Sequence, residues 1–410
     1  MPGPLANVRV VDLTAVLMGP FATQMLAEFG ADVIKIEPPT GDVVRQIGPA
    51  RNPGMGPIYL NANRGKRSLA VDLKDPDGRA AVLALIKDAD VVVYNMRPQA
   101  MARLGLTYED VAAVNPGVVY LGVFGYGQDG PYAARPAYDD LIQGAALLPA
   151  LFLASGASVP RYVPAAITDR IVAYAAVNAV LAALVHRAAT GVGQKIEIPM
   201  FETMVAFVLG DHLAGLTFDP PEGPAGYARL LSADRRPYRT SDGYICALVY
   251  TDKHWRGFLA AIGRAEVMAS DPRFASLEAR SRNIDAIYAE LGAIFETRTT
   301  AEWAEILERA DVPYTPMHTL ETIFEDPHLR ATDFFTAEEH PSEGRLKKMR
   351  TGGSWSATPV GVDRHAPRLG EQSREILAEA GYAPEAIDAL IAAGVVRAAA
   401  PIPDRAETAS

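Results

Sequence analysis

The chain has 410 residues, of which 49% are hydrophobic and 21% charged, so it is ordinary for a globular protein and long enough for two domains. Its net charge of −10 argues against a protein that tracks a nucleic-acid backbone, because such proteins need a basic surface. The one cysteine, Cys246, makes no intrachain disulfide, fits a reducing compartment and is expected to be a buried structural thiol. The N-terminal residues do not resemble a signal peptide, and the apolar run 171–185 is too short for a bilayer, so we expect a cytoplasmic protein.

Strands and helices alternate over the first ~200 residues. The pattern predicts strands at 8–13, 33–37, 68–73, 91–95 and 118–127, with helices at 20–29, 78–87 and around residue 111. This alternation predicts an α/β fold with a mostly parallel sheet covered on both faces. Ligands of such sheets bind beyond the carboxyl ends of the strands, here at 13–19, 37–45, 95–97 and 124–127. No P-loop is present, and no G-x-G-x-x-G motif is found between a strand and a helix, which argues against an NTPase or an ordinary NAD enzyme.

Positive charge gathers between residues 35 and 74 of this acidic chain. Three acidic residues accompany seven basic ones, a local balance of +4, and the basic residues are Lys35, Arg45, Arg51, Arg64, Lys66, Arg67 and Lys74. A local positive field suggests an anionic ligand such as phosphate. A solvated loop with charges clustered by chance is the other interpretation, and the residues alone leave both open.

Asp169 precedes an unusually apolar helix. From residue 171 to 185 only Tyr174 and Asn178 carry polar groups, and a helix that is apolar nearly all round is expected to be buried. Free N–H groups and the helix dipole should hold a carboxylate in its first turn ionised at neutral pH, as a candidate nucleophile or base. In the alternative interpretation, Asp169 merely caps the helix, with Thr168 as a competing cap.

The second half of the chain lacks the regular alternation of strands and helices. Residues 216–225 read as a linker and 226–325 as a small α+β domain, while 326–410 return to complete the large domain begun by 1–215. The seven histidines show no metal-ligand spacing, so no metal site is predicted. Asp139 and Asp140 are further candidate carboxylates, although they too stand where a helix could begin.

Several blocks, in order along nearly the whole chain, resemble the family III CoA-transferases, which include formyl-CoA and carnitine CoA-transferases and the α-methylacyl-CoA racemases. The blocks are VVDLTAVLMGPFATQMLAEFGADVIKIEPPTGD, NANRGKRSLAVDLKDPDG, VVVYNMRPQAMARLGLTYEDV, GVFGYGQDGPYAARPAYDDLIQG, TDRIVAYAAVNAVLAALVHRAATGVGQKIEI and APRLGEQSREILAEAGY. The resemblance implies a large Rossmann-like domain, a smaller α+β domain and an interlocked homodimer. The site would then lie between the large domain of one subunit and the small domain of the other.

The resemblance also implies site residues. Asp169 matches the nucleophile, whose carboxylate attacks an acyl-CoA thioester and passes through a mixed anhydride to an aspartyl-CoA thioester. The substrates would be an acyl-CoA and a small carboxylic acid, with coenzyme A as co-substrate and no metal. Tyr59, Tyr138 and Asp139 match positions that line the acyl site. Positions matching CoA contacts are Val16, Leu17, Met18, Val71, Asp72, Leu73, Lys74, Asn95, Met96, Arg97 and Arg103, with Lys35 and Arg45 as further candidates for the phosphates.

Departures from the family pattern narrow the choice among the reactions of the family. Leu17 stands where formate-specific members carry Gln, and their Gly-rich loop before the run YICALVY is missing, so formyl transfer is not expected. Racemase members carry Gly-His-Asp where this chain has Ala137-Tyr138-Asp139, and a tyrosine with an ordinary pKa of ~10 is a poor substitute for histidine. CoA transfer is therefore favoured over a 2-methylacyl-CoA racemase or epimerase and over a non-catalytic CoA-binding protein.

Arg170 follows the candidate nucleophile directly. It could bind a second carboxylate, which would favour a dicarboxylic donor such as succinyl-CoA. It could equally be a surface arginine in the first helical turn, and the sequence leaves both interpretations open.

Overall fold

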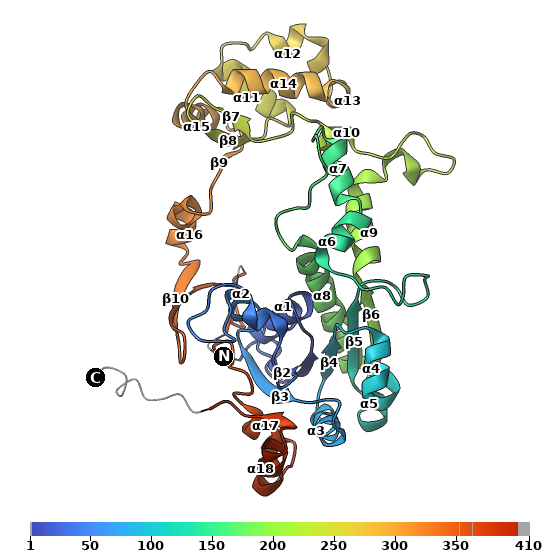
Figure 1. Ribbon diagram of the computed structural model, residues 1–410. Coiled ribbons are helices and arrows are strands. Elements are labelled where there is room, and N and C mark those ends of the chain that lie inside the picture. Colours follow the sequence, from blue (N-terminus) through green and yellow to red (C-terminus); the bar gives the residue numbers. More distant parts are fainter. Residues whose placement is uncertain (1, 352, 363, 401–410) are drawn as a thin grey trace, which may run out of the picture. The chain divides into compact units, whose positions relative to one another are not determined.

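The computed structural model describes residues 2–351, 353–362 and 364–400 (Figure 1). The chain forms two compact units. Unit 1 contains the chain up to Ala146, the segment Pro164–Val205 and the chain from His328 onward, and unit 2 contains Leu147–Val163 and Ala206–Pro327. The predicted boundaries placed 147–163 and 206–215 in the large domain. They differ because helix α7 (Leu148–Ala154) packs on α10 (Ala228–Leu231) inside unit 2.

Unit 1 is built on a seven-stranded sheet in the order β12-β3-β2-β1-β4-β5-β6. All neighbouring strands are parallel except β12, which pairs antiparallel with β3, so the predicted mostly parallel sheet is confirmed. The central strands are continuous apolar runs because both faces of the sheet are covered. The strands are β1 (Arg9–Leu13), β2 (Asp32–Glu37), β3 (Lys66–Val71), β4 (Val91–Tyr94), β5 (Val119–Phe124), β6 (Gln194–Pro199) and β12 (Val396–Arg397).

Helices cover the sheet, and segments from both ends of the chain contribute to the same core. In Figure 1, α17 and α18 (red) lie near α3 (blue), and their apolar side chains share one buried cluster with those of α3, α5 and the strands. A hairpin of β10 (Phe335–His340) and β11 (Gly344–Met349) also belongs to unit 1. The helices are α1 (Met18–Glu28), η1 (Val43–Gln46), α2 (Pro57–Ala62), α3 (Pro76–Ile86), α4 (Pro98–Leu104), α5 (Tyr108–Val114), α6 (Asp139–Ala145), α8 (Ile167–Thr190), α17 (Ser373–Glu379) and α18 (Pro384–Ala392). Two more helices, α9 (Met200–His212) and α16 (Pro327–Ala331), cross the boundaries between the units in sequence.

The order of the strands reverses between β1 and β4. The chain runs outward from β1 through β2 to β3, and then returns to place β4 on the other side of β1. Leu13 and Tyr94 are paired at the carboxyl ends of these two strands. In open α/β sheets the crevice beyond such a switch point is the usual ligand-binding place.

Unit 2 contains a three-stranded antiparallel sheet of β7 (Tyr238–Arg239), β8 (Tyr244–Ala247) and β9 (Tyr314–Pro316). Its core is aromatic, with ring contacts that join Trp255, Phe258, Phe295 and Trp303. Cys246 lies in β8 and is half-buried, so the expectation of a fully buried thiol is wrong. The helices are α7, η2 (Ala214–Thr217), α10, α11 (Asp252–Ala261), α12 (Val267–Ser270), η3 (Pro272–Phe274), α13 (Leu277–Arg282), α14 (Ile284–Phe295), α15 (Thr300–Arg309) and η4 (Thr322–Glu325).

Helix α8 extends beyond the apolar run 171–185 and is less buried than the sequence predicts. It spans 24 residues, and by length and composition alone it is apolar enough to cross a membrane, although a core helix of a folded domain passes the same test. One face packs on α1, α6, β5 and β6. Another stripe of the helix is open, where Tyr174 is 57% and Val185 is 72% exposed. The expectation that this helix is buried all round is therefore wrong for the single chain.

Candidate active site

Asp169 is the third residue of α8, and its carboxylate is not a helix cap. The backbone N–H of Asp169 donates instead to Oδ1 of Asp139, the first residue of α6, at 2.9 Å. The other oxygen of Asp139 accepts from Nε2 of Gln143 at 2.6 Å, which fixes its direction. Thr168 does not cap either, because its buried hydroxyl has no hydrogen-bond partner among the described residues. Asp139 fills the capping role, and this leaves the Asp169 carboxylate without a hydrogen-bond donor in the described part of the chain.

The charge state of Asp169 differs from the expectation. Partial burial, together with the nearby negative charge of Asp139, raises its pKa to about 7, although Arg170 opposes the shift. The expectation that it stays fully ionised at neutral pH is wrong, because its own N–H is already satisfied by Asp139 and no donor faces its oxygens. A carboxylate whose pKa lies near neutrality beside a second carboxylate is typical of a functional site.

Helix α8 packs directly on α1, the helix that begins at the switch point. The guanidinium of Arg170 lies over the ring of Phe21, in the first turn of α1, at 4.0 Å from the ring centroid. Tyr174, one turn further along α8, meets the same ring edge-on with 5.9 Å between centroids. These contacts connect the first turn of α8, where Asp169 lies, with the start of α1 at the switch point.

The loop between β1 and α1 is held in a strained conformation. Asn95, which follows β4, accepts a hydrogen bond from the N–H of Ala15 at 2.9 Å and donates to its carbonyl at 2.7 Å. Val16 has a φ of 70°, which is an outlier for a β-branched residue and costs about 1–3 kcal/mol. Its N–H donates to both oxygens of Asp42 at 3.1 Å. No side chain caps α1 at Leu17, so its first N–H groups face the switch point uncapped.

Most predicted CoA contacts lie at this carboxyl edge of the sheet. Residues 16–18, 71–74 and 95–97 directly follow β1, β3 and β4, and Arg103 is on α4, the next helix. Lys74, Arg97 and Arg103 are exposed, and none of them forms an ion pair within the described ranges. Arg97 donates only to the carbonyl of Ala134, at 3.2 Å. Three unpaired cations near the ends of parallel strands are suited to phosphate groups.

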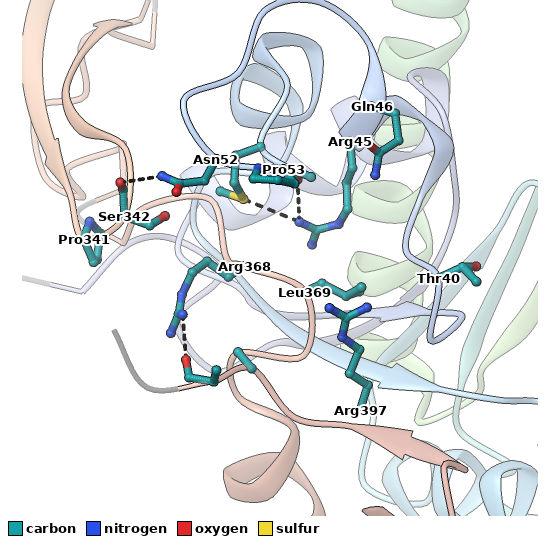
Figure 2. Close-up of a pocket in the computed structure, with 14 residues that line it drawn as sticks. Thr40, Arg45, Gln46, Asn52, Pro53, Pro341, Ser342, Arg368, Leu369 and Arg397 are labelled. Atoms are coloured by element: carbon teal, nitrogen blue, oxygen red, sulfur yellow. Dashed lines mark hydrogen bonds between the residues drawn. The ribbon is translucent and has the colours of Figure 1, made fainter. Parts of the chain in front are cut away.

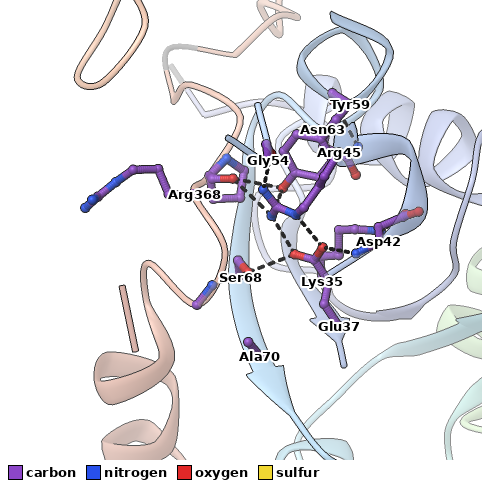
Figure 3. A network of polar contacts seen from close by, with 12 residues as sticks. Lys35, Glu37, Asp42, Arg45, Gly54, Tyr59, Asn63, Ser68, Ala70 and Arg368 are labelled. Carbon is purple, nitrogen blue, oxygen red and sulfur yellow. Dashed lines mark hydrogen bonds and ion pairs between the residues drawn. The ribbon is translucent and has the colours of Figure 1, made fainter. Parts of the chain in front are cut away.

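Lys35, Arg45 and Tyr59 are buried and bonded to neighbouring side chains, so their predicted contacts with a ligand stay predictions (Figure 3). Nζ of Lys35 contacts Oδ2 of Asp42 at 3.1 Å, and the Lys35 side chain is fully buried. Arg45 binds Glu37 in a bidentate pair with both distances at 2.7 Å, and also donates to the hydroxyl of Tyr59 at 2.6 Å. Tyr59 is 0% exposed and therefore lines no open acyl site in the subunit. We call these five residues the buried ionic network.

The basic excess between residues 35 and 74 is likewise mostly neutralised inside the fold. The sequence count missed this because most of the compensating carboxylates lie outside that window. The partners are Asp12 for Lys66, Glu28 for Arg64, and Asp32, Glu375 and Glu379 for Arg67. Of the seven basic residues, Arg51 and Lys74 are exposed and form no ion pair within the described structure.

A cavity of about 500 Å³ lies in unit 1 beside the turn between β10 and β11 (Figure 2). Arg45, Arg368 and Arg397 are among its lining residues, and no acidic residue of the described ranges lines it. Sequence reasoning missed it because Arg368 and Arg397 come from the C-terminal segment, far in sequence from the lining residues between 40 and 55. Asp169 does not line this cavity.

The predicted acyl-site residues on α6 differ in exposure. Tyr138 precedes α6 and is 67% exposed, whereas Asp139 is half-buried against α8. The absence of a metal site stays a prediction, and no group of three His, Cys, Asp or Glu side chains able to hold an ion occurs in the described residues.

Comparison with known proteins places this arrangement in a family. A family model described as CoA-transferase family III matches residues 5–373. The chain is 33% identical to a succinate–glutarate CoA-transferase of Agrobacterium fabrum over 92% of this chain and 95% of the relative. It is 31% identical to the succinyl-CoA:glutarate CoA-transferase of Homo sapiens, over 96% and 90% of the two chains. A solved CAIB/BAIF family protein from Brucella suis superposes with a TM-score of 0.78 at 30% identity, covering 93% of this chain and 100% of that one. The chain therefore belongs to CoA-transferase family III and is an enzyme of that family.

Proposed function

We propose that this enzyme moves CoA from an acyl-CoA donor to a carboxylic acid acceptor through a covalent intermediate on Asp169. The observation that carries the proposal is a half-buried carboxylate in the first turn of α8 whose pKa lies near 7 and whose oxygens receive no hydrogen bond from the described residues. Such a group is more nucleophilic when ionised than an ordinary aspartate, because its charge is not stabilised by donors. Its helix packs on α1, which begins at the switch point.

The reaction proceeds in four exchanges. An ionised Asp169 oxygen attacks the thioester carbonyl and expels CoA thiolate, which leaves an acyl–aspartyl anhydride. The thiolate attacks the carbonyl carbon of Asp169, releases the first acid and forms an aspartyl-CoA thioester. The acceptor carboxylate then attacks this thioester and expels thiolate, and a second anhydride results. In the last step the thiolate attacks the acyl carbonyl, which gives the new acyl-CoA and restores Asp169.

Asp139 is a positioning residue in this scheme. Its carboxylate holds the backbone N–H of Asp169, and its negative charge raises the pKa of that residue. The same contact orients the first turn of α8 without spending a hydrogen bond on the nucleophilic oxygens. The carboxylate of Asp169 is thus fixed in place through its backbone and remains chemically free.

We propose that CoA binds along the carboxyl edge of the sheet. The pantetheine arm would lie over the loop 15–18 and Asn95, with the phosphates toward Lys74, Arg97 and Arg103. Strain at Val16 and the tie between Ala15 and Asn95 support this, because backbone strain clusters at ligand sites. No metal is needed by this scheme, since each step exchanges one carboxylate or thiolate for another.

We also propose a homodimer in which the open face of α8 is covered. Tyr174 and Val185 on that face are exposed in one chain, although residues 171–185 carry polar groups only at Tyr174 and Asn178. Interlocked subunits would bring a partner's small domain to Asp169 and exclude water, which would otherwise hydrolyse the anhydride.

The names of the relatives suggest the substrate class. Succinate, glutarate and their CoA esters appear in them, and these acids carry two carboxylates. We therefore propose dicarboxylic acids for this enzyme.

The test is to replace the nucleophile. Asp169→Asn should lower CoA exchange between succinyl-CoA and glutarate by at least about 10⁴-fold, the scale on which loss of a covalent nucleophile acts. Incubating the wild-type enzyme with succinyl-CoA and hydroxylamine should leave a hydroxamate on Asp169 that mass spectrometry locates. Asp169→Asn should remain folded and be more stable than the wild type above pH 7. The raised pKa means that the native wild-type protein resists ionisation there, a penalty absent below the unfolded pKa of about 3.9.

Transfer by Asp169→Asn near the wild-type rate would contradict the covalent scheme. Solvent deuterium entering the α-carbon of a 2-methylacyl-CoA, with no acid acceptor present, would instead indicate racemisation.

A further inference from the structure

Arg170 is held in an unusual way for a residue in a first helical turn. Its guanidinium is half-buried, with Cζ over the Phe21 ring at 4.0 Å from the centroid, while Tyr174 packs edge-on against the same ring. A surface arginine would extend into solvent, so that interpretation of the sequence does not fit this packing. These contacts restrict the position of the guanidinium before any ligand arrives.

The edge of this guanidinium is unoccupied. Stacking uses the face of the group and leaves its N–H donors free for hydrogen bonds. Among the described residues, no carbonyl or carboxylate accepts a hydrogen bond from Arg170, and no oxygen of Asp169 lies within ion-pair distance. Arg67, by contrast, binds Asp32 and Glu379 through its N–H groups. The negative charge of Asp169 acts on this guanidinium, but the N–H donors of Arg170 receive no acceptor from the described residues and are suited to an anionic ligand.

We propose that Arg170 forms a carboxylate-binding subsite that recognises the second carboxylate of a dicarboxylic acyl group or acid. The proposal rests on the proposed function of Asp169 and adds the residue that selects the substrate. While one carboxyl carbon of the substrate meets Asp169, the other carboxylate accepts a fork of two N–H donors from Arg170. A monocarboxylic acid of equal length leaves that fork empty.

The position favours a substrate carboxylate over a CoA phosphate. Arg170 adjoins Asp169 in the chain, and Asp169 must meet the thioester carbon. In CoA the pantetheine arm separates the sulfur from all of the phosphates, so a phosphate cannot reach Arg170 while the thioester is at Asp169. The acyl group has no such spacer, and its far end lies within a few bonds of the reacting carbon.

The experiment compares acids matched in length. Glutarate and valerate each have five carbons, and only glutarate has a second carboxylate. With succinyl-CoA as donor, Arg170→Gln should raise the KM for glutarate by about 10- to 100-fold, the value of a charge-assisted bidentate hydrogen bond. The kcat/KM for valerate should change less than about threefold. Arg170→Lys should be intermediate, because it keeps the charge but loses the fork.

Arg374→Gln is the matched control. Arg374 is an exposed arginine on α17 paired with Asp388, so its loss removes the same charge without touching α8. It should leave both KM values unchanged. A second readout avoids turnover: glutarate should bind the Asp169→Asn variant and bind at least tenfold more weakly once Arg170→Gln is added, as isothermal calorimetry would measure.

The outcomes separate the two proposals. Equal changes in KM for glutarate and valerate overturn the subsite, as does a fall in kcat for both acids at unchanged KM, which would place Arg170's effect on Asp169 itself. Either result leaves the covalent mechanism standing. The absence of a hydroxamate on Asp169 in an active wild-type enzyme would instead overturn the proposed function. Undiminished glutarate binding by the double variant would overturn the subsite alone.

Discussion

Two charged regions of unit 1 differ in how their charges are paired. In the buried ionic network, Lys35 and Arg45 are each paired with a carboxylate, and Arg45 also holds Tyr59. In the first turn of α8, Asp169 and Arg170 are half-buried, adjacent in sequence and joined by no ion pair within the described residues. The comparison shows that charge alone does not mark a site. Function is indicated where a partly buried charge is left unmatched by its own chain.

The largest effect, a loss of stability, should come from breaking the buried ionic network. Arg45→Met leaves Glu37 buried without its bidentate partner and Tyr59 without its donor. Loss of one partner of a buried ion pair typically destabilises a protein by about 3–5 kcal/mol, so urea unfolding of the variant should show a loss of this size. Arg374→Met, which removes an exposed pair, should change the free energy of unfolding by no more than about 1 kcal/mol. If both variants lose the same stability, the network is not the structural element that its burial indicates.

A smaller effect should come from the pair of carboxylates at the proposed nucleophile, Asp169. The proposed mechanism needs Asp169 ionised, so kcat should rise with pH through about 7 and level off above it. Asp139→Asn removes the negative charge that raises this pKa but keeps an oxygen for the N–H of Asp169. The acid limb of the profile should therefore move to lower pH, by up to about one unit.

Glu375→Gln is the control for the pH experiment, because this exposed carboxylate pairs with Arg67 away from α8. An acid limb that stays in place in Asp139→Asn, or that moves equally in the control, would mean that Asp139 does not set the ionisation of Asp169.

The same contrast between paired and unpaired charges explains which features could be predicted from the sequence. The alternation of short apolar runs predicted the parallel sheet because buried strands carry that pattern locally. The position of Asp169 at the start of a long apolar helix was also a local signal. The internal pairing of Lys35, Arg45 and Tyr59 had no such local signal, because residues that bind a ligand and residues that pair inside the fold look alike in the sequence.

The prediction of the charge state of Asp169 failed for a related reason. Its N–H is taken by Asp139, which lies 30 residues earlier on another helix, so the dipole argument omitted the competing carboxylate. The exposed face of α8 could not be foreseen either, because apolar periodicity does not say whether a helix is covered by its own chain or by another.

The smallest effects should come from the exposed cations at the carboxyl edge of the sheet. Lys74, Arg97 and Arg103 are free of ion pairs in the described structure, and solvent screens exposed charges, so each should contribute about 0.5–1 kcal/mol to CoA binding. Single changes to Gln should then weaken CoA binding by about two- to fivefold at low salt, and less at high salt, as fluorescence or calorimetric titration would measure. Arg51→Gln, a change on the loop beside β11 where the Arg51 guanidinium donates to the carbonyl of Glu343, should leave CoA binding unaltered. The salt dependence is the decisive part, because a loss that persists at high salt would point to a packing role rather than to phosphate recognition.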